Sequence, residues 1–342
     1  MLSHASVLVL ILLFALAAGA VWIAGRRLAE GTDAISERLK LGHTLGGLLL
    51  LAVATNLPEL AITVAAAHEG RRDLIAGSLL GSIAAQTAVL AAIDGIVYRK
   101  GEPLTFRAGS LELVLEGVLV MAMLAVLVTA TQLPPMMIGH FTTPSGLLIL
   151  AGWGVGIFLL NRARHGLPWE PAGERPTQPE WKDEFPKGNP WPTFLVAALV
   201  TLVAGVVLEE TSDALATRLH LGGLVFGATV LAAAGALPEL SSCLAAVRAG
   251  NDRLAVSDVL GGHVFLPVLF VVANAVSGRT VLAGAQKGDV YLTALGILLT
   301  AVFVYGLIFR SRRQVLRMGV DSLVVLGLYV GGMVGLAIVV RR

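Results

Sequence analysis

The sequence predicts an all-α polytopic membrane protein of ten transmembrane helices, arranged as two inverted five-helix repeats. Of its 342 residues, 56% are hydrophobic and 14% are charged, so too little polar surface remains to cover a water-soluble globule. Ten apolar runs are long enough to cross the hydrocarbon layer of a bilayer, which is about 30 Å thick. The tetrapeptide Leu-Pro-Glu-Leu occurs twice, at 57–60 and 237–240, inside two of these runs.

The similarity between the two copies extends beyond the tetrapeptide. An offset of 180 positions aligns residues 32–84 with residues 212–264 without a gap, and 20 of these 53 pairs are identical. A diverged duplication leaves such agreement, whereas shared apolar composition does not readily give it. We therefore predict a first repeat at 1–161, a cytoplasmic linker at 162–191 and a second repeat at 192–342.

The expected spans also predict the orientation of the chain. They lie near residues 5–24, 42–68, 74–97, 109–131, 145–161, 192–209, 221–248, 254–277, 289–309 and 318–340. Of the 25 Lys and Arg residues, 18 lie in or directly beside the connections on one side of these spans and seven lie on the other side. Positively charged connections stay in the cytoplasm, so we expect the linker inside and both termini outside. An odd number of spans per half then makes the duplication an inverted-topology repeat.

Each half is expected to contain one broken helix. Pro58 and Pro238 have no backbone N–H and clash with the carbonyl four residues earlier, so the second and seventh spans should kink or break there. At that depth, irregular backbone is tolerated only where it is buried in protein or lines a cavity. The breaks therefore predict a polar centre between the halves.

Two carboxylates lie at these breaks, and both fall near the middle of the membrane. An ionised Glu59 or Glu239 at that depth costs on the order of 3 kcal/mol on insertion scales. A bound cation or protons would remove this cost, and the backbone carbonyls near Thr55 and Gly235 would add oxygen ligands. The alternative is that each carboxylate is protonated or paired with a polar neighbour and serves helix packing.

The spans that follow the breaks carry further polar side chains. Ser78, Ser82 and Gln86 are four residues apart and share one helix face. The matching positions in the second half are Asp258, Gly262 and Leu266. His263 falls off that face, and we consider it either a structural histidine or a proton-sensitive group near the pathway. The two halves are therefore predicted to be chemically unequal.

These segments resemble the calcium/cation antiporter superfamily, and most closely its sodium/calcium exchanger branch. That branch has two alpha-repeats of the form G-T-S-x-P-E followed by G-N-x-x-G-S-N-x-x-N/D. The first repeat here reads A-T-N-L-P-E at 54–59 and G-S-L-L-G-S-I-A-A-Q at 77–86, and the second reads G-A-L-P-E at 235–239 and S-D-V-L-G-G-H-V-F-L at 257–266. The spacing agrees throughout, whereas the second repeat departs from the pattern at several ligand positions.

The resemblance implies a cation site with Glu59 and Glu239 as its central ligands. It places Thr55, Ser82 and Gln86 at further ligand positions, and we add the Gly235 carbonyl. Asp258, His263 and Ser78 are predicted to be proton-coupled or to support the ligands. Since the second repeat has lost side chains that would build sodium sites, we expect weakened sodium coupling or its replacement by protons.

The sequence therefore predicts a secondary active antiporter rather than an enzyme. We expect Ca2+ to exchange against Na+ or H+ by alternating access, with no cofactor, with inorganic cations and the lipid bilayer as partners, and with no nucleic acid. Its expected location is a prokaryotic inner or plasma membrane. The alternative is a divergent, non-transporting member of the same family that acts as a membrane scaffold or cation sensor. An intramembrane enzyme is disfavoured because the sequence has no H-E-x-x-H motif and no Ser/His pair that recurs in a catalytic context.

Overall fold

The computed structural model describes residues 5–38, 51–97, 102–138, 142–164, 166 and 189–341, which are almost entirely helical. The first half contains α1 (Val7–Arg38), α3 (Leu57–His68), α4 (Arg72–Ile96), α5 (Leu104–Ala108), α6 (Leu111–Ala130) and α7 (Pro144–Arg164). The second half contains α8 (Trp191–Arg218), α9 (Gly223–Phe226), the π-helical turn η2 (Gly227–Leu231), α10 (Ala232–Gly235), α11 (Leu237–Ala249), α12 (Asp252–Phe265), α13 (Val268–Ser277), the 3-10 turn η3 (Leu282–Gly284), α14 (Lys287–Phe309) and α15 (Val320–Arg341). Strands β1 (Gln314–Val315) and β2 (Met318–Gly319) form a small antiparallel hairpin.

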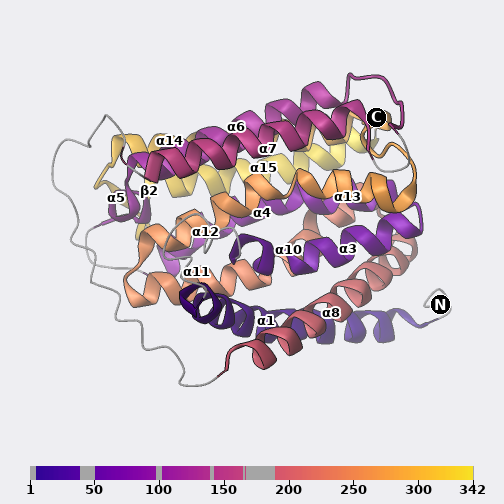
Figure 1. Ribbon diagram of the computed structural model, residues 1–342, viewed down its shortest axis with the longest axis horizontal. Coiled ribbons are helices and arrows are strands. Elements are labelled where there is room, and N and C mark those ends of the chain that lie inside the picture. The colour runs from indigo at the N-terminus through magenta and orange to yellow at the C-terminus, as the bar shows by residue number, and fades with distance from the viewer. Residues whose placement is uncertain are drawn as a thin grey trace.

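The helices form a layered bundle with α4 in its interior (Figure 1). Helices α1 and α8 pack against each other in opposite directions along one side of the molecule, and α6, α7, α14 and α15 cover the other side. The broken helices lie between these layers. The start of α1 and the end of α15 lie at the same end of the molecule.

The all-helical class is confirmed. The described residues contain eight helices that are long and apolar enough to cross a membrane, or nine if the bent pair 223–235 and 237–249 is one span. Of the expected span at 42–68, the structure describes α3 and a helical segment at 51–55, and residues 42–50 lie outside the described residues. Most of the 162–191 linker also lies outside them.

The predicted ends of two spans were wrong. Helices α1 and α8 were expected to stop near residues 24 and 209, but they continue to Arg38 and Arg218. These extensions are amphipathic. Apolar residues such as Ile35 of α1 and Leu215 of α8 are buried, whereas charged residues such as Arg38 and Arg218 in the same extensions are exposed. Hydropathy finds only the fully apolar part of such a helix. The two helix ends are 180 positions apart, which agrees with the repeat offset.

Both predicted helix breaks are present in the structure. In the first half, the helical segment that ends at residue 55 is interrupted at Asn56, directly before α3. In the second half, α10 and α11 meet at Ala236 with a bend of 44°. From these breaks, α3 and α11 extend toward opposite ends of the molecule (Figure 1).

Glycines allow the α1–α8 layer to approach the two breaks closely. A Cβ on Gly25 of α1 would be 2.5 Å from Cβ of Pro238, and one on Gly205 of α8 would be 3.0 Å from the carbonyl oxygen of Pro58. Gly25 and Gly205 are again 180 positions apart. Helix α1 thus contacts the proline of the second half, and α8 contacts the proline of the first half, through glycines at equivalent repeat positions.

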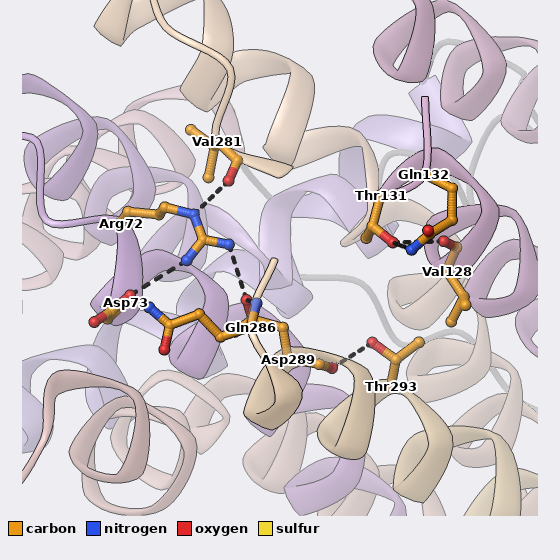
Figure 2. Close-up of polar contacts among 9 residues, drawn as sticks. All are labelled: Arg72, Asp73, Val128, Thr131, Gln132, Val281, Gln286, Asp289 and Thr293. Carbon is orange, nitrogen blue, oxygen red and sulfur yellow. Dashed lines mark hydrogen bonds and ion pairs between the residues drawn. The ribbon is translucent and has the colours of Figure 1, made fainter. Parts of the chain in front are cut away.

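Polar contacts fix the end of the molecule where α4 begins. The Arg72 guanidinium donates to the Val281 carbonyl oxygen at 2.6 Å and to the Asp289 carboxylate at 2.9 Å (Figure 2). Beside it, Arg71 pairs with Glu209 of α8 at 2.8 Å and also contacts Glu69 and Asp213. The turn between α3 and α4 is thereby tied to both α14 and α8.

At the opposite end, Arg107 is expected to be a main determinant of stability. It binds both carboxylate oxygens of Asp252, at 3.0 and 3.1 Å, and both side chains are at most 8% exposed. Arg107→Gln should lower the free energy of unfolding by about 3–5 kcal/mol, because Asp252 would remain buried without its cation. Reversible denaturation in detergent micelles measures this loss. Arg27→Gln, which breaks an exposed pair with Glu30, is the control, and an equal loss in both variants would contradict the assignment.

Candidate cation site

The two helix breaks bring two buried carboxylates to the start of α3 and α11. Glu59 and Glu239 are each the third residue of their helix and have no exposed surface. The N-terminus of a helix carries partial positive charge, which favours a carboxylate in the first turn. The proline before each glutamate lies in the first turn of its helix. Proline suits that place, because the first backbone N–H groups of a helix have no partner within it and the N–H that proline lacks is not missed.

Each glutamate lies against the break of the other half. A Cβ on Gly235 would be 2.8 Å from Oε1 of Glu59, and the Thr55 side chain lies beside the Glu239 carboxylate. Thr55 and Gly235 occupy the same repeat position, four residues before their own glutamate. The Glu239 carboxylate is also close enough to Glu59 for the two groups to interact electrostatically. The structure thus assembles one centre from both halves.

Helix α4 contributes the polar face predicted from the spacing of its residues. Ser82 donates a hydrogen bond of 3.4 Å to Oε1 of Glu59. Ser78 and Gln86 are buried on the same helix, and neither side chain has a hydrogen-bond partner among the described residues. Of the three, Ser82 is the one seen in direct contact with a central carboxylate.

Helix α12 contributes a third carboxylate beside the centre. Oδ2 of Asp258 accepts a hydrogen bond of 2.5 Å from Ser242, whose hydroxyl also lies 3.1 Å from the Glu239 carbonyl oxygen. His263 is fully buried, and neither ring nitrogen has a hydrogen-bond partner in the described part of the chain. The geometry therefore links Asp258 to the Glu239 segment and shows no such link for His263.

Two further polar residues of this region were not predicted from the sequence. Ser242 joins Asp258 to α11, and it lies three residues after Glu239, where one helical turn returns to the same face. Asn56 is fully buried at the first break, and its amide lies against Gly262 of α12. Asn56 stands at the serine position of the G-T-S-x-P-E pattern, and that departure was the available signal.

The centre offers oxygen ligands of the kind that hard cations prefer. Two carboxylates, a serine hydroxyl and backbone carbonyls at the breaks suit Ca2+ or Na+, whereas sulfur and imidazole ligands suit softer metals. Within the described ranges, no group of three or more His, Cys, Asp or Glu side chains is arranged to hold a metal. The arrangement is thus two carboxylates supplemented by neutral oxygens.

The fold and this centre define an integral membrane protein of the transporter class, and comparison with known proteins identifies its family. The chain matches the family described as Sodium/calcium exchanger protein over residues 9–161 and 189–337. It belongs to that family, whose members are antiporters and not enzymes. The family match falls in two segments, which correspond to the two halves of the chain.

Relatives agree with this assignment. The chain is 25% identical over 278 residues to the Alkalimonas amylolytica protein named "Putative antiporter CaxA", covering 80% of this chain and 82% of that protein. It is 27% identical over 225 residues to the inner membrane protein YrbG of Escherichia coli, covering 64% of this chain and 65% of YrbG.

Solved structures share the fold at low sequence identity. Native YfkE aligns with a TM-score of 0.65 and 17% identity, covering 94% of this chain and 91% of YfkE. The sodium-calcium exchanger NCX_Mj, soaked with Na+ and without Ca2+, aligns with a TM-score of 0.58 and 16% identity, covering 96% of this chain and 99% of NCX_Mj. These similarities establish the exchanger fold of the chain.

Proposed function

We propose that this cation antiporter exchanges Ca2+ against Na+ or H+ by alternating access at Glu59 and Glu239. One observation carries the proposal: both carboxylates are fully buried at helix breaks, and each lies against the break of the opposite half. Alternating access would expose this shared site to one side of the membrane at a time, as α1 and α8 slide against the remaining helices.

Charge balance favours a divalent cation or two monovalent ones at this centre. Two ionised carboxylates that face each other without a cation would repel, and burial makes each charge costly. Ca2+ neutralises both at once, and its preferred six to eight oxygens are available from the two carboxylates, Ser82, backbone carbonyls and water. Two protons neutralise the same pair, so one Ca2+ can exchange for two H+.

The composition of the second repeat favours protons over several sodium ions as the coupling species. Ser82 of α4 contacts Glu59, but the equivalent position of α12 is Gly262, and Leu266 replaces the last polar ligand of the pattern. Each additional sodium ion needs its own set of oxygens. Fewer side-chain oxygens therefore mean fewer sodium ions in each cycle.

The decisive experiment is 45Ca2+ uptake into proteoliposomes under an outward proton gradient and, separately, under an outward sodium gradient. We expect the proton gradient to drive the larger uptake. Uptake driven by sodium alone would contradict proton coupling but keep the antiporter proposal. Absence of uptake with either gradient, combined with Ca2+-dependent protection of the glutamates from carbodiimide labelling, would favour the non-transporting sensor instead.

A further inference from the structure

The connection between α14 and α15 is basic and carries an exposed leucine at its tip. Residues 310–319 read R-S-R-R-Q-V-L-R-M-G, with four arginines and no acidic residue. Strands β1 and β2 fold this segment into a hairpin whose turn consists of Leu316 and Arg317. The Leu316 side chain is 81% exposed, and Val315 beside it is also exposed. The tip therefore presents apolar surface that is flanked by arginines.

The conformation of the turn is costly for these two residues. Val315 pairs with Met318, so Leu316 and Arg317 form a two-residue turn, and their φ angles are 52° and 68°. A two-residue hairpin turn with both φ angles positive is normally Asn-Gly, because larger side chains are crowded in that conformation. Leucine and arginine therefore do not serve the turn itself, which indicates that their side chains act outside the hairpin.

The hairpin is held by the core of the molecule on both of its flanks. The buried Asp94 carboxylate near the end of α4 accepts a hydrogen bond of 2.7 Å from the backbone N–H of Gly319. The guanidinium groups of Arg310 and Arg312 lie 4.9 and 4.8 Å from the centre of the Phe106 ring of α5. These contacts require the folded chain, so a ligand that binds the hairpin should stabilise the fold.

The hairpin lies where the apolar layer ends. It joins two helices that are long and apolar enough to span a membrane, and β2 lies at the end of the molecule opposite to both chain termini (Figure 1). Tyr305 and Phe309, in the last turns of α14, are exposed and stack with their ring centres 4.3 Å apart. Exposed aromatic residues gather where hydrocarbon meets the lipid headgroups. The arginines that follow Phe309 are therefore at headgroup level.

The charge of the hairpin matches the membrane leaflet that it is expected to face. The connection at 310–317 belongs to the side of the chain that is rich in Lys and Arg, which we expect to lie in the cytoplasm. The cytoplasmic leaflet carries anionic lipids, and each arginine close to its surface strengthens binding about fivefold. An exposed leucine adds to this binding when it enters the boundary of the acyl chains.

We propose that the β1–β2 hairpin is a binding surface for anionic phospholipid. Arg313 and Arg317 contact the lipid phosphates, and Leu316 enters the acyl-chain boundary. Free phosphate would satisfy the arginines but would leave the exposed leucine without a role, so the leucine favours a lipid as the ligand. This surface is separate from the cation centre, and its function does not depend on which cation is exchanged.

The test measures the unfolding temperature of the full chain in neutral detergent during titration with short-chain phosphatidylglycerol, which is anionic. Phosphatidylcholine with the same acyl chains and inorganic phosphate are titrated separately. We expect phosphatidylglycerol to raise the unfolding temperature at concentrations where the other two leave it unchanged. Equal stabilisation by phosphatidylcholine would show that lipid charge is not recognised, and equal stabilisation by inorganic phosphate would show that no lipid is needed. Either result would overturn the inference.

The arginines are tested by the double variant Arg313→Gln/Arg317→Gln. Its apparent affinity for phosphatidylglycerol should fall about 25-fold, since about fivefold is lost with each arginine. The control is Arg279→Gln/Lys287→Gln, which removes two exposed positive charges at the other end of the molecule, where α4 begins, and should keep the native affinity. Equal weakening in both double variants would contradict a specific role of the hairpin.

The turn is tested by Leu316→Asn/Arg317→Gly, which gives it the residues that its conformation favours. This variant should unfold at a higher temperature than the native chain in detergent alone, because the turn is no longer strained. Its response to phosphatidylglycerol should nevertheless be weaker, because the leucine and one arginine are lost. A variant that is more stable and still responds as the native chain does would show that the tip does not bind lipid.

Discussion

Glu59→Gln is expected to abolish cation exchange. Glutamine keeps the shape of the side chain and removes its charge, so the site loses half of its negative charge and one of two proton acceptors. Interactions with a charged group contribute about 1.5–3 kcal/mol each, and Glu59 contributes more than one, so uptake should fall by about a hundredfold or more. The measurement is 45Ca2+ uptake into proteoliposomes at matched protein content.

Glu112→Gln is the matched control for this variant. Glu112 lies in the first turn of α6 with its side chain exposed, so its replacement removes the same charge far from the centre and should leave uptake unchanged. Glu239→Gln should reproduce the loss, because the two glutamates form one site. Normal uptake by Glu59→Gln would remove the basis of the proposed mechanism.

Gly81→Ala is expected to disrupt the packing that supports the site. A Cβ at this position would collide with the Cα of Ala228 and lie 2.7 Å from its carbonyl oxygen, so α4 and η2 would have to separate. Overpacking of this kind costs about 1–3 kcal/mol. Because α4 carries Ser82 and η2 leads to Gly235, the same displacement would open the contacts around Glu59. We therefore expect reduced stability together with a large loss of transport.

Gly154→Ala provides the comparison, since a Cβ on this glycine of α7 would meet no atom within 4 Å. Alanine favours a helix over glycine by up to about 1 kcal/mol, so this variant should be as stable as the native chain or slightly more so. The unfolding temperature in detergent and 45Ca2+ uptake measure the two effects. Equal behaviour of the two variants would show that close packing of α4 against η2 is dispensable.

The sequence by itself determined the class of the protein and the location of both helix breaks. Composition and run length required a helical membrane protein, because only helices satisfy every backbone group within an apolar segment. The two Leu-Pro-Glu-Leu motifs located both breaks, since proline interrupts a helix wherever the tertiary structure places it. These properties are local, and a single segment is enough to reveal them.

Only the tertiary structure decided which residues meet across the halves. The contact of Gly235 with Glu59, the Ser242 bridge to Asp258 and the approach of Asn56 to Gly262 each join segments that are distant in sequence. The amphipathic ends of α1 and α8 also escaped prediction, because their buried faces depend on neighbours that hydropathy does not see. The absence of a polar side chain at position 262 is visible in the sequence, but the approach of the Asn56 amide to this position is not, since packing is set by distance in the fold.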